Sequence, residues 1–255
     1  MRNPPGLGVN FAVSRRRSLA AGAVPGSPSA WVLRKAASIA VVSRRKLGDP
    51  LSMAWLEWIA PESGLRVEGD GIRLRPPRAH DYAEWRELRA VSRGFLQPWE
   101  PTWPADDLSR AAFRRRLTAY ARDREAGAAY PFFVFRSSDD ALAGGITLSN
   151  IRRGVAQMGS VGYWCGRPFA RHGHTLAAVR ALSNFAFRTL GLHRLEAACI
   201  PDNGPSRKLL LKAGFDEEGY SRAYLKINGV WRDHVLFGLI SPLTAPEGPD
   251  EGVSV

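Results

Sequence analysis

Three strand-like runs follow one another closely in the middle of the chain, and they constrain the fold more than any other feature. The runs, 130–136, 141–149 and 157–166, are rich in Phe, Val, Ile, Leu, Tyr and Trp. Short turn-forming sequences, Ser-Ser-Asp-Asp and Arg-Arg-Gly, separate them. Aromatic and β-branched runs divided by such turns are typical of antiparallel strands. The sequence therefore predicts an antiparallel meander.

Segments of helical and strand character lie on either side of this meander. Helices are predicted over 80–92, 107–126, 174–190 and 203–213, and further strands over 71–75, 193–200, 215–227 and 231–240. The last two strands join at Asn228-Gly229, which is a strong hairpin turn. This order of elements predicts an α+β fold with one mixed sheet.

Local signals mark the ends and faces of these helices. Asn203 is a natural N-cap, and Pro205 suits the first helical turn. In the helix over 80–92 apolar residues recur at spacings of three, which predicts a stripe of Tyr82, Trp85, Leu88 and Val91. The segment 95–104 is too rich in proline for a helix or a central strand, yet it carries three aromatic residues. Loops of this kind are usually functional.

Positive charge is concentrated at the start of the chain. The net charge is +12 over 255 residues, and residues 1–52 hold nine basic groups against the single acid Asp49. That stretch lacks helical and strand periodicity, so we expect disorder there. A basic tail can contact phosphate on RNA or a ribosome, although most such segments are simply solvated. The stretch could also be an organelle transit peptide or a secretory signal. We favour a third interpretation, in which residues 1–52 are untranslated upstream sequence and translation begins at Met53.

The sequence divides into four parts on these grounds: the basic extension 1–52, a lead-in 53–70, a folded domain 71–242 and a tail 243–255. Charged residues interrupt every run of about 18 apolar residues, so we expect no membrane span. Cys165 and Cys199 lie in apolar segments, which favours core positions in a reducing compartment, and we expect a cytoplasmic location. His172 and His174 have no nearby Cys or acid, so we expect no metal.

Seven motifs in the folded domain point to one family. Three are general: Val161-Gly-Tyr-Trp164, the turn 167–173, and Asn203-x-x-Ser206 ahead of Gly214-Phe215. Four are more particular: Leu96-x-Pro-Trp-Glu-Pro101, Leu148-Ser-Asn-x-x-Arg-Gly154, Glu218-Gly-Tyr220 and Gly229-x-Trp-Arg-Asp-His234. Together they resemble the GNAT acetyltransferases of the RimJ/RimL type, which acetylate the N-termini of ribosomal proteins, and the last four resemble RimJ. The resemblance implies a GNAT fold over about 71–242, with a mixed, mostly antiparallel sheet flanked by helices.

The resemblance implies acetyl-CoA as co-substrate, bound in a splayed gap between two parallel strands, here 157–166 and 193–200. The pantetheine arm would pair with exposed strand backbone near Tyr163 and Trp164. The pyrophosphate would lie on N–H groups at a helix N-terminus, where the helix dipole favours an anion. The residues expected to form this cradle are Arg171, His172, Gly173, His174 and Thr175.

This cradle departs from the usual family pattern at two positions. Ala170 stands where the family usually has Gln or Arg, and Thr175 stands where it has a small residue. Because most cofactor contacts would be made by the main chain, we expect weakened rather than lost binding. These two departures are also the sequence features that favour a non-catalytic relative.

The resemblance places acetyl transfer at Asn203-x-x-Ser206. Many GNAT enzymes use a Tyr four residues after the Ser206 position as the acid, but here that residue is Leu210. RimL-like relatives use the Ser of Asn-x-x-Ser, so the resemblance implies that Ser206 donates a proton to the leaving thiolate and that Asn203 hydrogen-bonds the cofactor arm. Both residues could instead simply satisfy the start of their helix.

The base is less determined by the sequence. A terminal amine has an ordinary pKa of about 8 and is partly neutral at pH 7, so water held by one carboxylate would suffice. Glu100 in the proline-rich loop is the first candidate. The alternatives are Glu196, Asp233 and His234, and each of the four could instead be a structural ion-pair partner. Trp99 and Trp103, together with Tyr163, are expected to line the acceptor site.

Three functions are consistent with these residues. The first is acetyl-CoA-dependent acetylation of a protein N-terminal amine, with Ala or Ser on a ribosomal protein as the expected acceptor. The second is acetylation of a small amine such as an antibiotic, a polyamine or an amino acid. The third is a non-catalytic ribosome-assembly or nucleic-acid-binding factor that uses the basic tail. An open groove between the proline-rich loop and the last hairpin would favour a peptide acceptor, and a closed acidic pocket would favour a small amine.

Overall fold

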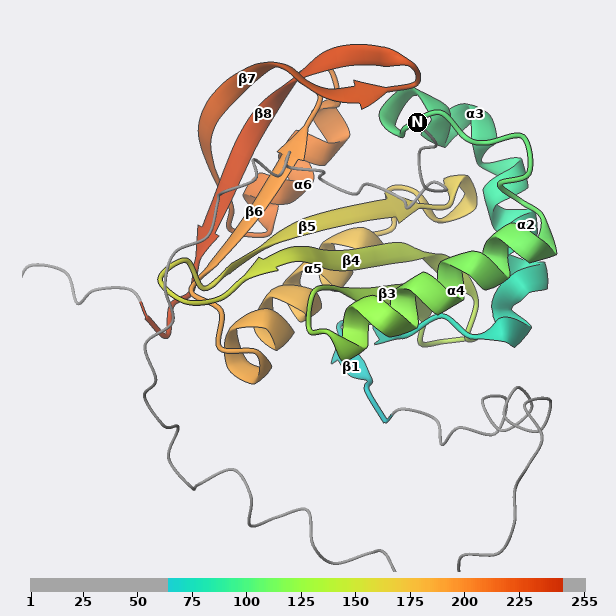
Figure 1. Ribbon diagram of the computed structural model, residues 1–255, viewed down its shortest axis with the longest axis horizontal. Coiled ribbons are helices and arrows are strands. Elements are labelled where there is room, and N and C mark those ends of the chain that lie inside the picture. The colour runs from blue at the N-terminus through green and yellow to red at the C-terminus, as the bar shows by residue number, and fades with distance from the viewer. Residues whose placement is uncertain (1–63, 245–255) are drawn as a thin grey trace, which may run out of the picture. The chain divides into compact units, whose positions relative to one another are not determined.

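One eight-stranded sheet carries the fold of the computed structural model, which describes residues 64–244 (Figure 1). Its strands are β1 (Val67–Gly69), β2 (Ile72–Arg75), β3 (Tyr130–Arg136), β4 (Leu142–Arg152), β5 (Met158–Cys165), β6 (Arg194–Cys199), β7 (Asp216–Ile227) and β8 (Val230–Ile240). They lie in the order β1-β2-β3-β4-β5-β6-β8-β7. Only β5 and β6 pair in parallel among these strands, which confirms the predicted mixed, mostly antiparallel sheet.

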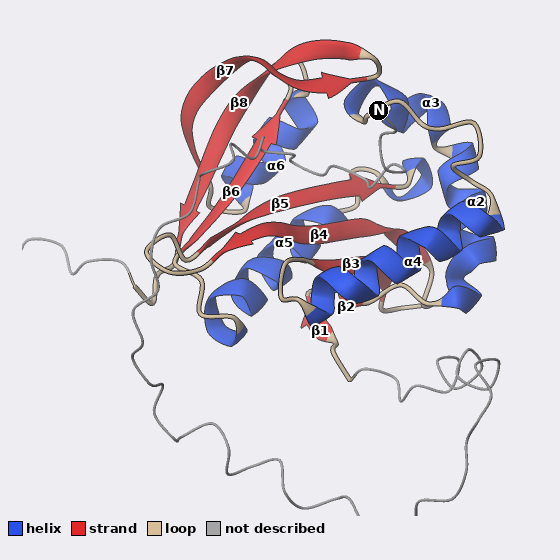
Figure 2. Ribbon diagram, in the orientation of Figure 1, coloured by secondary structure: helices blue, strands red, loops and turns tan. Residues whose placement is uncertain are grey.

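Helices cover both faces of the sheet (Figure 2). They are α2 (Tyr82–Val91), α3 (Arg93–Leu96), α4 (Arg110–Glu125), α5 (His174–Asn184) and α6 (Gly204–Lys212), with a π-helical turn, η4 (Phe185–Thr189), directly after α5. Helix α5 packs on β1 to β5 from one face, and α2 and α4 pack on β4 and β3 from the other. Each of these described helices is too short or too polar to cross a membrane.

Two apolar clusters fill the space on either side of the sheet. The larger lies under α5 and includes Ile146, Val161 and Leu182, all nearly inaccessible to solvent. The smaller lies under α2 and α4 and is built around Trp85 and Phe113, whose ring centroids are 4.8 Å apart. Neighbouring residues of one strand point to opposite faces, so a single strand supplies both clusters. Burying each large side chain contributes roughly 1.5–3 kcal/mol.

Helix α2 differs from the prediction in which side chains it buries. Trp85 and Leu88 are buried as expected, but Val91 is 57% exposed. A helix turns by about 100° per residue, so a spacing of three drifts steadily around it, and Val91 lies opposite Tyr82 after nine residues. Arg89, four residues after Trp85, occupies the buried face instead.

Other element boundaries moved for local reasons. Helix α4 begins at Arg110 rather than at 107, because the Ser109 side chain accepts a hydrogen bond from the Ala112 N–H and caps the helix there. The predicted helix over 174–190 is α-helical only to Asn184 and continues as η4, whose last bond joins the Leu190 N–H to the Phe185 carbonyl. Strand β1 lies within the predicted lead-in, so the sheet begins before residue 71.

The predictions for 1–52, for most of the lead-in and for the tail beyond residue 244 fall outside the described residues. They concern the basic extension, the start at Met53 and any contact of that extension with RNA or a ribosome.

Candidate active site

Strands β5 and β6 separate after a short parallel segment. Their paired residues are Met158 with Arg194, Gly159 with Leu195 and Ser160 with Glu196. Beyond this point β5 stays paired with β4 and β6 with β8, so the two edges that face each other make no ladder (Figure 1). Unpaired strand edges carry free N–H and C=O groups. This fork matches the splayed gap that the resemblance implied, and its backbone fits an amide-containing arm such as pantetheine.

The turn after β5 leads into the N-terminus of α5. Arg171 and Gly173 both have left-handed backbone conformations, with φ of 68° and 85°. Gly173 is the N-cap and provides no side-chain hydrogen bond, and the first helical bond in this turn runs from the Ala177 N–H to the Gly173 carbonyl. The preceding N–H groups of α5 are therefore directed out of the helix, toward a position that favours an anion.

The side chains around this turn add little negative charge. The His172 and His174 rings stack with centroids 6.0 Å apart. Burial, the positive charge of Arg136 and neighbouring His172 lower the pKa of His174, so its ring is neutral near pH 7. Among residues 64–244 no three His, Cys, Asp or Glu side chains gather as a metal site would require. The fork and the α5 terminus together fit the arm and the pyrophosphate of acetyl-CoA.

Ser206 meets Tyr163 across the fork. The Tyr163 hydroxyl lies 2.8 Å from Ser206 Oγ, which joins β5 to the first turn of α6. Burial raises the pKa of Tyr163, and the contact with Ser206 offsets only part of this rise, so the phenol keeps its proton. Cys199 interacts with the same pair, and burial raises its pKa to about 11. The phenol and the thiol therefore both stay protonated near pH 7.

Asn203 has the capping role that the sequence predicted. Its Oδ1 accepts a hydrogen bond from the Ser206 N–H at 3.2 Å, and α6 begins at Gly204 with Pro205 in its first turn. The cap fixes where Ser206 points, and a bond from Asn203 to the cofactor arm stays a prediction. Leu210 is fully buried in the core. The tyrosine that the resemblance describes at this position is thus absent, and Tyr163 of β5 brings a phenol to Ser206 instead.

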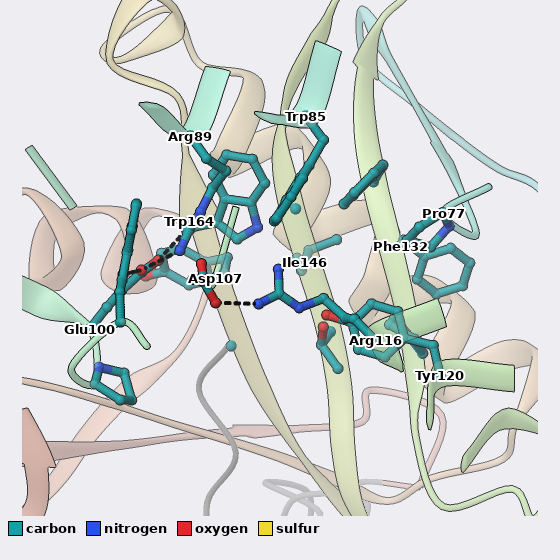
Figure 3. Close-up of a pocket in the computed structure, with 18 of the residues that line it drawn as sticks. Pro77, Trp85, Arg89, Glu100, Asp107, Arg116, Tyr120, Phe132, Ile146 and Trp164 are labelled. Atoms are coloured by element: carbon teal, nitrogen blue, oxygen red, sulfur yellow. Dashed lines mark hydrogen bonds and ion pairs between the residues drawn. The ribbon is translucent and has the colours of Figure 1, made fainter. Parts of the chain in front are cut away.

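A pocket lies on the opposite face of the sheet, between the strands, α2, α4 and the proline-rich loop (Figure 3). Its volume is about 60 Å³. The part of β5 that is not paired with β6 forms one wall, through Gly162, Tyr163 and Trp164. The pocket therefore reaches the same stretch of β5 that carries the phenol of the Tyr163–Ser206 pair.

The loop wall of this pocket is held by a buried ion pair. Arg89 donates to both oxygens of Glu100, each at 2.7 Å, and the Trp103 indole N–H also donates to Glu100 at 2.7 Å. The Arg89 guanidinium lies over the Trp103 ring at 4.0 Å and over Trp164 at 5.0 Å. Both Glu100 oxygens are already occupied by donors. The structure thus favours an ion-pair partner for Glu100 over the expected base.

A second pair lines the α4 side of the pocket. Arg116 donates to Asp107 Oδ1 at 2.8 Å, and both side chains are largely buried. Tyr120 lies beside them, and burial raises its pKa, so it is a neutral phenol. Figure 3 shows Asp107 between the Arg89–Glu100 pair and Arg116. None of Arg89, Asp107, Arg116 and Tyr120 was predicted, although Arg89 stands on the apolar face of α2, four residues after Trp85.

The expected acceptor-site aromatics divide between the pocket and its surroundings. Trp103 and Tyr163 line the pocket, whereas Trp99 lies in the short helical turn Gln97–Trp99 ahead of the loop wall. Trp164 was expected near the cofactor, but its side chain packs edge-on against Phe133 on the pocket face. Only its backbone borders the fork.

Two acidic candidates have partners elsewhere. Glu196 lies in the paired part of the fork and forms ion pairs with Arg152 and Arg194, at 3.5 and 3.4 Å. Asp233 accepts hydrogen bonds from the Tyr220 hydroxyl at 2.6 Å and the Ala223 N–H at 2.7 Å, which hold an irregular turn of β7. The Tyr220 bond lowers the pKa of Asp233. These contacts give both residues structural roles.

The tip of the last hairpin closes against the proline-rich loop. The Asn228 N–H donates to the Glu100 carbonyl at 2.9 Å, and Gln97 Nε2 donates to Asn228 Oδ1 at 3.4 Å. His234 on β8 is buried, and its Nδ1 lies 3.0 Å from the Arg232 carbonyl oxygen. Loop and hairpin thus touch at this point, and a hollow of about 400 Å³ lies between them, lined by Gly94, Gln97, Pro98, Ile227, Asn228, Val230 and Arg232. The smaller pocket is walled by the loop and not by the hairpin.

Comparison with known proteins agrees with this geometry. A family model described as an acetyltransferase (GNAT) domain matches residues 72–216. The probable N-acetyltransferase YjcK of Bacillus subtilis (strain 168) is 35% identical over 176 residues, covering 69% of this chain and 97% of that protein. The ribosomal protein uS5-alanine N-acetyltransferase of Escherichia coli (strain K12) is 34% identical over 190 residues, covering 72% and 98%.

Solved structures show the same relationship. Mycobacterium smegmatis RimJ in complex with CoA-disulfide superposes with a TM-score of 0.67 at 29% identity, over 73% of this chain and 92% of that one. The chain thus shares its fold with an enzyme that binds CoA. It belongs to the GNAT family of N-acetyltransferases, which use acetyl-CoA as acetyl donor.

Proposed function

We propose that the protein transfers an acetyl group from acetyl-CoA to the N-terminal α-amine of a protein, and that the acceptor is a ribosomal protein beginning with Ala. The observation that carries this is the 34% identity to the uS5-alanine enzyme over nearly that protein's whole length. The pocket of about 60 Å³ supports it, because a cavity of that size admits a side chain as small as that of Ala or Ser. We place the reaction in the cytoplasm with its ribosomal acceptor.

The chain's own residues supply binding and proton transfer. Acetyl-CoA, when bound, presents its acetyl thioester for attack by the amine. The open edges of β5 and β6 and the N-terminus of α5 hold the arm and the pyrophosphate. The pocket on the opposite face delivers the amine to the part of β5 that is not paired with β6. Orientation of two reactants in this way can supply a large share of a rate enhancement.

Ser206 and Tyr163 form the proton-donating pair. Ser206 Oγ donates its proton to the departing sulfur while the Tyr163 phenol, 2.8 Å away, donates a hydrogen bond to Ser206 Oγ. The proton that the attacking amine loses passes through water to restore the Ser206 hydroxyl. Tyr163 suits this hydrogen-bonding role because burial raises its pKa, so the hydroxyl keeps its proton and stays a donor to Ser206. The amine needs no strong base, since its ordinary pKa of about 8 leaves part of it neutral near pH 7.

Two variants separate these roles. Ser206→Ala and Tyr163→Phe should each lower kcat by about 10- to 100-fold while KM for acetyl-CoA changes little, because each removes a hydroxyl of this hydrogen-bonded pair without touching the fork backbone. Equal losses in kcat and in acetyl-CoA affinity would assign Ser206 to binding or to helix capping.

The function itself is tested by thiol release from acetyl-CoA by the purified full chain. The acceptors are short peptides beginning with Ala or Ser and a panel of small amines. Release that depends on the peptides supports the proposal. Release with small amines alone would replace it with small-amine acetylation, and acetyl-CoA binding without any release would favour the ribosome-assembly or nucleic-acid-binding factor.

A further inference from the structure

The acceptor pocket contains two buried polar atoms without hydrogen-bond partners among residues 64–244. One is Asp107 Oδ2 and the other is Arg89 Nε. They are of opposite kind, since the first accepts a hydrogen bond and the second donates one. Leaving such atoms unpaired inside a protein costs free energy, more for charged groups than for neutral ones. Both residues line the same pocket.

Their surroundings hold these atoms in place. The Asp107 side chain is 7% exposed, and Arg116 donates to its Oδ1. This ion pair holds the carboxylate in place, although Oδ2 itself takes no part in it. Arg89 is held by both of its terminal nitrogens on Glu100 and by stacking on Trp103. A guanidinium fixed through that fork has its Nε–H direction determined as well.

The charges around the pocket balance. Arg89 pairs with Glu100 and Arg116 pairs with Asp107, while Tyr120 is a neutral phenol. A pocket with balanced charge does not repel an incoming amine. Within residues 64–244, Asp107 Oδ2 has no hydrogen-bond partner and is therefore available to accept from that amine. An amine donates an N–H to a carboxylate whether it is protonated or neutral.

We propose that Asp107 Oδ2 accepts a hydrogen bond from the acceptor's terminal amine while Arg89 Nε donates one to the carbonyl oxygen of the acceptor's first residue. The pocket then selects α-amino amides, which are the N-termini of chains, over amines that lack an adjacent carbonyl. This inference rests on the proposed function, because it names the part of a protein substrate that the site recognises.

The site is tested with Asp107→Asn, which keeps the shape and an acceptor for Arg116 but places an NH₂ group or an uncharged oxygen opposite the amine. KM for a peptide beginning with Ala should rise about 10- to 100-fold, the range expected for a charge-assisted hydrogen bond, with KM for acetyl-CoA unchanged. Asp106→Asn is the matched control. Asp106 is the neighbouring aspartate, also paired with an arginine, but its side chain is 54% exposed.

A binding measurement keeps the test independent of folding and of turnover. Calorimetry on the CoA-saturated enzyme compares the free-amine peptide with the same peptide in which a propionyl group replaces the first Ala, so that the methyl and the carbonyl stay and the nitrogen is absent. Asp107→Asn should weaken binding of the free-amine peptide and leave binding of the propionyl peptide as it was. An equal loss for both peptides, or no loss for either, would overturn the amine contact.

The carbonyl contact has its own substrate pair. Alaninamide and sec-butylamine are both primary amines on a branched carbon, but only the first has a carbonyl group beside it. Because an α-amine has an ordinary pKa of about 8 and an alkylamine one of about 10, the two are compared per neutral amine. On that basis wild-type kcat/KM should favour alaninamide, and equal values would overturn the contact with Arg89. If the wild type used sec-butylamine and ignored peptides, the proposed function would fail, and the Asp107→Asn comparison with that amine would still decide the amine contact.

Discussion

Replacing Glu100 by Gln distinguishes a structural ion pair from a catalytic base. Glu100 and Arg89 are each 7% exposed at the side chain and are joined by two bonds of 2.7 Å, and Trp103 adds a third. Removing one charge of such a pair leaves the other buried and uncompensated, which costs about 3–5 kcal/mol. Gln retains one carbonyl oxygen for Arg89, so we expect about 3 kcal/mol for Glu100→Gln.

This loss should appear directly in thermal unfolding. For a domain of this size 1 kcal/mol corresponds to roughly 2–4 °C, so Tm should fall by roughly 6–12 °C. The acetylation rate of Glu100→Gln should fall only as far as the proline-rich loop loses its order. The shape of the pH–rate profile should not change, because Glu100 is not the base.

A double-mutant cycle gives the coupling between the two residues. Arg89→Met combined with Glu100→Gln removes both charges, so the double variant should be more stable than the sum of the single losses allows. An unchanged Tm for Glu100→Gln together with a flattened pH–rate profile would refute the structural assignment and restore Glu100 as the base.

Two further predictions concern the cofactor turn and the last hairpin. Gly173→Val forces a β-branched residue into φ of 85° and should raise the Kd for CoA. The control, Gly191→Val at φ of 64° beyond the far end of α5, should lower Tm and leave that Kd unchanged. Equal changes in Kd would contradict the anion cradle at the start of α5. Burial lowers the pKa of His234, so its folded form binds fewer protons than its unfolded form and stability is lost as pH falls below about 6.5. His234→Gln should therefore flatten the fall of Tm between about pH 7 and pH 5, and an identical slope in the variant would exclude His234 as its source.

The strands and the fork could be predicted because they depend on local patterns and on family resemblance. Aromatic and β-branched runs with turn sequences predicted β3, β4 and β5, and the capping signal of Asn203 placed the start of α6. The short parallel pairing of β5 with β6 followed from the resemblance, since no local pattern says where two strands part. β1 was missed because its three residues are too few to form a pattern.

The site chemistry was harder to predict because its contacts join distant segments. Tyr163 and Ser206 are 43 residues apart in sequence, and nothing local to either residue indicates that their hydroxyls meet. The Arg89–Glu100 pair depends on how the proline-rich loop folds back on α2. One sequence signal could have indicated Arg89, namely its position four residues after Trp85 on the apolar face of the helix. The prediction missed it because a spacing of three residues placed Val91 on that face instead.

Locating the transferred acetyl group tests the central claim most directly. The full chain is incubated with acetyl-CoA and a peptide that begins with Ala and contains an internal Lys, and fragmentation mass spectrometry assigns the modified nitrogen. We expect a single acetyl group on the α-amine of the first residue. Acetylation of the Lys side chain, or an unmodified peptide alongside rapid acetylation of small amines, would contradict the proposed function.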